Sequence, residues 1–241
     1  MRAQTRHQLK QDAFSRITYG TAEKTAHWSV EHRSTLVGGI IAVVVIAALV
    51  GGGWYYQSQQ NEKASFDLTQ ASRTLEAQIR PAGTPAQPDV PSFTSAKERA
   101  DAAKKQFQAI VDNYPHTHTA EVARYFLGVS SASMGDDAAA EQSFKQVASS
   151  GGKELSSLAN LALAGLYGDT SRMKDAVAIY QQLIQHPTTA VSKVTAELQL
   201  AALYESSGQP ADAKKLYEQI KKDNPATEAG QLATQKLAAL K

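Results

Sequence analysis

The chain of 241 residues lacks cysteine, so lipoprotein processing, which attaches lipid to a cysteine, is excluded. Catalytic and ligand-binding signatures are missing as well. The sequence has no H-E-x-x-H zinc motif, no G-x-x-x-x-G-K-[ST] phosphate loop and no G-x-S-x-G nucleophile elbow. These absences predict a protein that is not an enzyme, binds no cofactor and holds no metal.

Long apolar runs are equally scarce, and a single one is present. Residues 36–56, LVGGIIAVVVIAALVGGGWYY, carry no charged side chain. As a helix this run reaches roughly 31 Å, the thickness of the hydrocarbon core of a bilayer. A buried core helix of this length would show a polar stripe, and a cleaved signal peptide would have a shorter basic region than the 35 residues that precede the run. We therefore predict one retained transmembrane helix over residues 36–56.

Positive charge is concentrated before this run. Residues 1–35 contain six basic and three acidic residues, whereas the remainder of the sequence holds 19 basic and 20 acidic residues. Because lysine and arginine accumulate on the cytoplasmic side of single spans, the N-terminus is predicted to be cytoplasmic and the larger part of the protein to lie outside. Trp54, Tyr55 and Tyr56 stand where an interfacial aromatic belt belongs.

An internal repeat of 36 or 37 residues follows the span. In each copy an aromatic residue has an alanine four positions before it and an aliphatic residue three positions after it. Small residues let two helices cross closely, the aromatic fills the gap between hairpins, and proline ends the second helix. The pattern resembles the tetratricopeptide unit, a helix pair of about 34 residues. The four sets are Ala103, Phe107 and Ile110; Ala140, Phe144 and Val147; Ala176, Tyr180 and Leu183; Ala213, Tyr217 and Ile220.

The predicted fold class is therefore all-α: a single N-terminal transmembrane helix followed by a tetratricopeptide-like α-solenoid of helical hairpins. A membrane-proximal helix is expected over 57–80, and the four prolines of residues 81–94 break it. That helix and residues 95–114 resemble one repeat whose halves the insertion separates. The predicted parts are a cytoplasmic basic tail (1–35), the transmembrane helix (36–56), the membrane-proximal helix with the proline-rich insertion (57–94) and the repeat domain (95–241).

Other polar residues give weak signals. His116 and His118 follow a proline in a turn and have no third metal ligand at a suitable spacing, so they are interpreted as solvated loop histidines. Asp136 and Asp137 are interpreted as acids of a turn and a helix N-terminus rather than catalytic carboxylates. The near-neutral charge of the repeat part argues against nucleic-acid binding.

The resemblance to tetratricopeptide arrays implies that the first helix of each pair lines a concave groove. The residues that the register places there are mostly apolar and lack the lysine, arginine and asparagine with which some arrays grip carboxylate tails of chaperones. Such a groove favours an apolar helix or an unfolded segment, bound by burial of nonpolar area at about 25 cal/mol per Å². The alternative is a groove filled by the protein's own terminal helix or by a second copy. The groove candidates are Val122, Tyr125, Val129, Leu158, Leu161, Thr195, Leu198 and Ala202.

The whole layout resembles a known family. A single span ending in GGGWYYQSQQNEKAS, followed by repeats that close on ADAKKLYEQIKKDNPATEAGQLATQKLAAL, is similar to the ancillary subunit of the bacterial Sec translocon over residues 36–241. The resemblance implies the bacterial inner membrane, a repeat domain that faces the periplasm, and translocon subunits, chaperones or exported chains as partners. The long basic tail and the insertion at 81–94 depart from that family.

Two functions are compatible with these observations. The first is a membrane-anchored protein–protein interaction module that meets exported chains near the translocon and passes them to chaperones. The second is a structural scaffold subunit of another envelope assembly, with its groove permanently filled. Small residues four positions apart in the span, such as Gly38 and Ala42, also permit association with a second copy.

Overall fold

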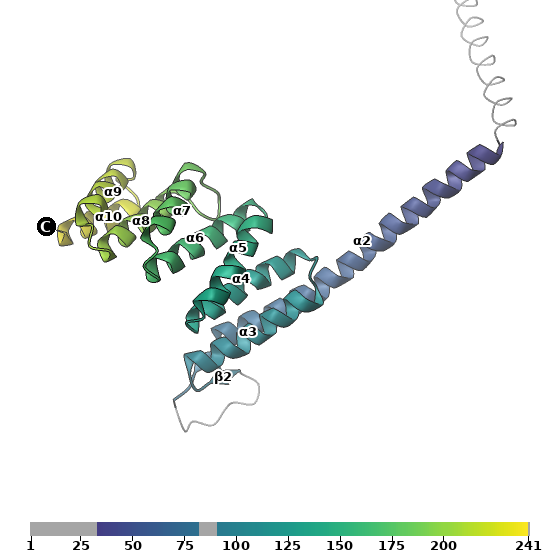
Figure 1. Ribbon diagram of the computed structural model, residues 1–241, viewed down its shortest axis with the longest axis horizontal. Helices are drawn as coiled ribbons and strands as arrows, with labels where there is room; N and C mark the ends of the chain where they lie inside the picture. Colours follow the sequence, from purple (N-terminus) through teal and green to yellow (C-terminus); the bar gives the residue numbers. More distant parts are fainter. Residues whose placement is uncertain (1–32, 82–90, 241) are drawn as a thin grey trace, which may run out of the picture. The chain divides into compact units, whose positions relative to one another are not determined.

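The computed structural model describes residues 33–81 and 91–240, and these residues are almost entirely helical (Figure 1). The predicted all-α class is confirmed. Residues 1–32 of the basic tail and residues 82–90 of the insertion lie outside the described part. The described helices are α2 (Arg33–Glu76), α3 (Ala96–Asn113), α4 (His118–Ser133), α5 (Asp137–Ser150), α6 (Lys153–Asp169), α7 (Met173–Gln185), α8 (Lys193–Ser206), α9 (Pro210–Asp223) and α10 (Glu228–Ala239).

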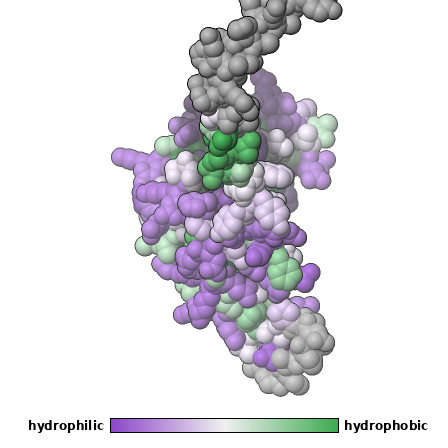
Figure 2. All heavy atoms as spheres, turned by 90° about the vertical axis from the view of Figure 1, so that its right-hand side faces the viewer, coloured by the Kyte–Doolittle hydropathy of each residue, from purple (hydrophilic) through white to green (hydrophobic). Residues whose placement is uncertain are grey.

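Helix α2 contains the predicted span. Among the described residues, Ile41–Glu76 is the one helical stretch that is long and apolar enough to cross a membrane. The large apolar side chains of residues 41–56 are exposed, Leu49 at 71% and Trp54 at 75%. Figure 2 shows one group of hydrophobic residues toward the upper end of the described residues, and hydrophilic residues predominate elsewhere on the face shown. Exposed apolar surface of this kind fits a single membrane anchor, and the side of the membrane on which the repeats lie stays a prediction.

The C-terminal part of α2, residues 59–76, belongs to the repeat array. Ala64 and Ala71 are fully buried in one cluster with Phe107 of α3. The hydroxyl of Tyr114 donates a hydrogen bond of 2.9 Å to the Asp67 carboxylate of α2. This packing agrees with the expectation that the membrane-proximal helix and the segment after the insertion form one hairpin.

The helix predicted to reach residue 80 ends earlier, at Glu76. Two short strands follow: β1 (Gln78–Ile79) pairs in parallel with β2 (Ser92–Phe93). The amide of Arg80 also donates a hydrogen bond of 2.8 Å to the Phe93 carbonyl. The backbone of residues 78–80 therefore forms hydrogen bonds with residues 92–93, on the other side of the insertion, in place of helical hydrogen bonds.

The remaining helices stack as hairpins, each packed on its neighbours in sequence, and the first helices α4, α6, α8 and α10 also contact one another in order. All twelve repeat-defining alanine, aromatic and aliphatic residues are buried, none of them more than 4% exposed. Where α4 crosses α5, a Cβ added to Gly128 would stand 2.6 Å from Cε1 of Phe144. The close crossing and the aromatic filler predicted from the repeat are thus confirmed.

Local signals define the helix ends. The Ser95 hydroxyl accepts a hydrogen bond of 3.1 Å from the Glu98 amide and caps α3, and Pro210 is the first residue of α9, as predicted. The turns between the paired helices use one left-handed residue at equivalent positions. This residue is Gly135 (φ +77°), Ser171 (φ +60°) and Gly208 (φ +75°) in successive pairs.

Helix α10, the last described helix, packs against α9 and α8. Ala229, Leu237 and Leu240 contact the cluster that contains Tyr217, whereas Leu232 is 43% exposed. The terminal helix therefore covers the last hairpin rather than lying over α4 and α6.

Candidate partner-binding surface

The predicted groove residues lie on three neighbouring helices. Val122, Tyr125 and Val129 belong to α4, Leu158 and Leu161 to α6, and Thr195, Leu198 and Ala202 to α8. Ala202 is exposed, and the other seven are partly buried. Side chains of this kind are held by the protein on one side and remain open to a partner on the other.

Four of these residues meet on a single core. Tyr125 and Val129 of α4 and Leu158 and Leu161 of α6 pack against the central cluster that includes Phe144. The ring of Tyr125 lies 5.8 Å from that of Phe144 and 5.4 Å from that of Phe126, measured between centroids. Burial raises the pKa of the Tyr125 hydroxyl. We call these four residues the α4–α6 patch.

The other four residues are not brought into this patch. Leu198 packs against the C-terminal cluster, and Val122 belongs to none of the clusters among the described residues. The Thr195 hydroxyl lies 2.7 Å from that of Ser192, whose oxygen also accepts a hydrogen bond from the Thr195 amide. Thr195 therefore serves the N-terminus of α8. The Ser-x-x-Thr spacing at this helix start is the sequence signal that indicates such a cap.

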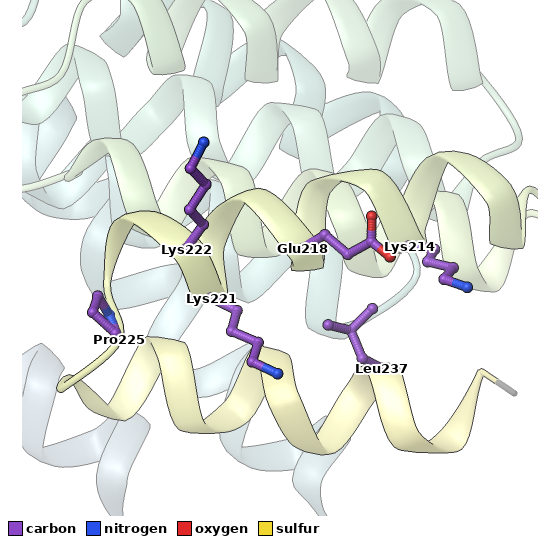
Figure 3. Close-up of a pocket in the computed structure, with 6 residues that line it drawn as sticks. All are labelled: Lys214, Glu218, Lys221, Lys222, Pro225 and Leu237. Atoms are coloured by element: carbon purple, nitrogen blue, oxygen red, sulfur yellow. The ribbon is translucent and has the colours of Figure 1, made fainter.

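Clefts also open elsewhere on the array, at places that no sequence pattern indicated. One, of about 460 Å³, lies between α9 and α10 and is shown in Figure 3. In that view Leu237 points from α10 toward α9, whose Lys214, Glu218 and Lys221 line the opposite side. The lysines are exposed, so this cleft is an open surface with basic walls.

Another cleft, of about 430 Å³, lies beside the 65% exposed Phe66 and the Tyr114 that contacts α2. A smaller one, of about 270 Å³, is polar and is enclosed by α3, α4 and α5. It faces a different side of α4 from the patch, because Arg124 and Ser131 line it while Tyr125 and Val129 do not.

The strongest electrostatic cluster is structural. The Glu141 carboxylate lies 2.6 Å from Lys145 Nζ and accepts hydrogen bonds of 2.9 Å from Arg172 and from the Tyr167 hydroxyl. Together Lys145, Arg172 and Tyr167 lower the pKa of Glu141 from 4.5 to about 2. The Arg172 guanidinium also stands 3.8 Å from the centroid of the Tyr167 ring. These contacts join α5, α6 and the start of α7. The charged groups of the cluster pair with one another.

A similar contact joins the last three helices. The Tyr217 hydroxyl donates a hydrogen bond of 3.1 Å to Glu205, which also lies 3.1 Å from Lys236 Nζ. Burial is the main reason that the pKa of Tyr217 is raised to about 12, and the hydrogen bond to Glu205 adds to the effect.

The remaining polar candidates behave as surface and cap residues. His118 Nδ1 lies 3.3 Å from a Glu121 oxygen, and the described residues contain no group of three His, Asp or Glu side chains arranged to hold a metal. Asp136 accepts a hydrogen bond from the Ala139 amide at the start of α5, as predicted, and lies 2.8 Å from Lys104 Nζ. The Lys104 contact, followed by the Ala139 amide, lowers the pKa of Asp136.

Comparison with known proteins identifies the repeat. The profile of a family described as "Tetratricopeptide repeat-like domain" matches residues 26–241. The crystal structure of a tetratricopeptide repeat protein from Parabacteroides merdae is similar, with 18% identity and a TM-score of 0.46 over 60% of this chain. The match covers 54% of that protein's chain, so this chain spans about half of its length. No curated protein matches, and no translocon family is identified.

Proposed function

We propose a protein-binding role from one premise: this chain belongs to the family of tetratricopeptide repeat-like domains, which matches residues 26–241. Domains of this kind mediate contacts between proteins and are typically not catalytic. The proposed function is a membrane-anchored interaction module that binds apolar segments of other proteins. The α4–α6 patch is its proposed binding surface.

The observation that carries the proposal is the partial exposure of four apolar side chains on adjacent helices. Tyr125, Val129, Leu158 and Leu161 are anchored on the central core and are still open to solvent. A helix that presents apolar residues at i, i+3 or i+4 and i+7 matches two such parallel rows. Burial of the exposed apolar area on both partners supplies the binding free energy, at about 25 cal/mol per Å².

The proposed location is the bacterial inner membrane, with residues 1–35 in the cytoplasm and the array in the periplasm. The exposed apolar part of α2 and the excess of basic residues before it support this assignment. The proposed partners are exported chains, periplasmic chaperones or translocon subunits, following the resemblance of the layout to the ancillary translocon subunit. A scaffold subunit of another envelope assembly would instead keep one partner on the patch permanently.

Crosslinking from the patch separates these functions. A photo-reactive amino acid replaces Leu161 in the full-length protein, and intact membranes are irradiated while new proteins are being exported. Gln181, an exposed residue of α7 outside the patch, is the control position. We expect a heterogeneous set of newly made polypeptides from Leu161 and none from Gln181. One constant adduct supports the scaffold alternative, and equal labelling from both positions refutes a specific surface.

A substitution tests the same surface by a different route. Leu161→Asp places a charge in the patch and is expected to reduce partner crosslinking from Val129, whereas Leu232→Asp on the exposed side of α10 is expected to leave it unchanged. Circular dichroism and thermal melting check that both variants fold. If Leu161→Asp melts the array, Leu161→Ala repeats the test with a smaller perturbation. Unchanged crosslinking in a folded variant would contradict the proposal.

A further inference from the structure

The polar cleft between α3, α4 and α5 is built by rows of side chains on three helices. It has a volume of about 270 Å³. Its polar lining residues recur at helical spacing, so that each helix turns one stripe toward the same space. They are Lys104 and Gln108 of α3, Arg124 and Ser131 of α4, and Gln142 and Gln146 of α5. We call this site the α3–α5 cleft.

Two large residues of the repeat pattern are absent at this cleft. The tetratricopeptide unit carries W-x₂-L-G-x₂-Y along its first helix. Residues 124–131 of α4 read R-x₂-L-G-x₂-S, so arginine stands in place of the tryptophan and serine in place of the tyrosine. The next two first helices keep the tyrosine, as Tyr167 and Tyr204. Tyr167 is only 4% exposed, and its hydroxyl reaches the preceding helix α5, where it donates a hydrogen bond to Glu141.

The groups that replace these side chains lack partners of their own. The Ser131 hydroxyl is completely buried and has no hydrogen-bond partner among the described residues. Leaving such a hydroxyl unsatisfied is unfavourable. Arg124 is partly buried, and no hydrogen bond or ion pair engages it within the described part of the protein. Lys104, in contrast, is neutralised by Asp136 at 2.8 Å.

Among its lining cations, the cleft therefore presents one uncompensated positive charge, with hydroxyl and amide donors around it. We propose that the α3–α5 cleft binds a carboxylate carried by a partner polypeptide, either on an acidic side chain or at its C-terminal end. A guanidinium pairs with a planar carboxylate through two parallel hydrogen bonds. Gln142 and Gln146 supply further donors. A single unpaired cation matches the single charge of a carboxylate better than the double charge of a phosphate group.

This site goes beyond the proposed apolar surface and does not depend on it. Arg124 and Ser131 lie on one side of α4, and Tyr125 and Val129 lie on another. The patch and the cleft are therefore separate surfaces of the array. Each contact can fail without the other.

Nuclear magnetic resonance of the full-length protein in detergent micelles tests the cleft directly. The glutamine side-chain amides are labelled with ¹⁵N, and Gln142→Asn and Gln146→Asn assign the two signals of the cleft. The probes are acetyl-Gly-Glu-Gly-amide, the same peptide with glutamine in place of glutamate, acetyl-Gly-Gly-Gly with a free carboxyl terminus, and inorganic phosphate. We expect the glutamate peptide, the free-acid peptide or both to shift these signals, and the glutamine peptide to leave them unchanged.

Three variants give the controls. Arg124→Gln is expected to weaken binding of the acidic peptide that shifts the signals about tenfold or more, because it removes a charge-assisted hydrogen bond. Ser131→Tyr places in the cleft the side chain that the next repeat has there. It is expected to abolish binding while leaving the melting temperature equal or higher. Lys105→Gln removes an equal charge from an exposed position of α3 outside the cleft and is expected to change nothing.

Three results would overturn the proposal. One is equal titration, by the unchanged protein and by folded Arg124→Gln, of whichever acidic peptide shifts the two signals. Another is tighter binding of phosphate than of either acidic peptide, which would make the cleft a phosphate site. The third is an absence of shifts at Gln142 and Gln146 with every probe. None of these results changes the crosslinking expected from Leu161, so failure of the cleft and failure of the patch are distinguishable.

Discussion

Replacement of Gly128 by alanine sets two opposing effects against each other. Alanine favours the interior of a helix over glycine by about 1 kcal/mol. The added Cβ of this variant would stand 2.6 Å from Cε1 and 2.8 Å from Cδ1 of Phe144. The Phe144 ring is 2% exposed and lies against Tyr125, so it has little room to move away. Overpacking of a well-filled core costs about 1–3 kcal/mol.

The net result expected for Gly128→Ala is a loss of about 0–2 kcal/mol in the free energy of unfolding. Gly165→Ala in α6 is the matched control, because the nearest atom to its added Cβ is the Tyr180 hydroxyl oxygen at 4.0 Å. This control gains the helix preference without the clash. Because the helix preference cancels between the two variants, their difference equals the overpacking term of about 1–3 kcal/mol.

Urea unfolding of the full-length protein in detergent, followed by far-ultraviolet circular dichroism, measures both variants. A second comparison uses the Phe144→Leu background, in which the penalty of Gly128→Ala should shrink because the clashing ring is gone. If Gly128→Ala stabilises the array as much as Gly165→Ala does, the close crossing of α4 and α5 does not limit the size of this residue.

Three further changes test the turns and charged contacts. Ser171→Gly should raise stability by about 1 kcal/mol, since Ser171 has the left-handed conformation (φ +60°) that glycine adopts freely; an unchanged melting temperature would contradict this. Lowering of the Glu141 pKa from 4.5 to about 2 corresponds to about 3 kcal/mol, which screening reduces to about 1–2 kcal/mol for a carboxylate one quarter exposed. A depressed carboxyl pKa stabilises the fold above pH 4.5, and the effect disappears as the pH falls toward 2. Glu141→Gln should therefore be destabilised at pH 7 and show a flatter acid dependence in urea titrations; equal acid dependence would refute this. Asp136→Ala should lower stability by removing the cap of α5, and Asp136→Asn should lower it less, because the side-chain amide oxygen still accepts the Ala139 hydrogen bond; equal losses in thermal melts would assign the effect to the Lys104 pair instead.

Local chemistry made the hairpins predictable. The alanine, aromatic and aliphatic positions repeat because every helix pair solves the same packing problem, and Ser95 and Pro210 mark helix starts through contacts within a few residues. The early end of α2 was not predictable in this way. It depends on pairing between Gln78–Ile79 and Ser92–Phe93, which lie on opposite sides of the insertion.

The candidate surfaces show the same division. The repeat register brought Leu158 and Leu161 to the same core as Tyr125, but it also included Thr195, whose hydroxyl is engaged at a helix start. Two observations identify the α3–α5 cleft. Arg124 and Ser131 depart from the repeat pattern, and neither side chain has a hydrogen-bond partner among the described residues. The departures are visible in the sequence, whereas the missing partners are visible only in three dimensions.

A stack in which each helix packs on its neighbours in sequence is expected to unfold first at its outer helices. Helix α10 rests on α9 and α8, while the central cluster draws on α4 to α9. Unfolding that begins at α10 would therefore shorten the stack one layer at a time, and the middle layers would remain folded longer than α10. The α4–α6 patch and the α3–α5 cleft both lie in layers removed from α10. We therefore expect both surfaces to stay folded when the last layer unfolds.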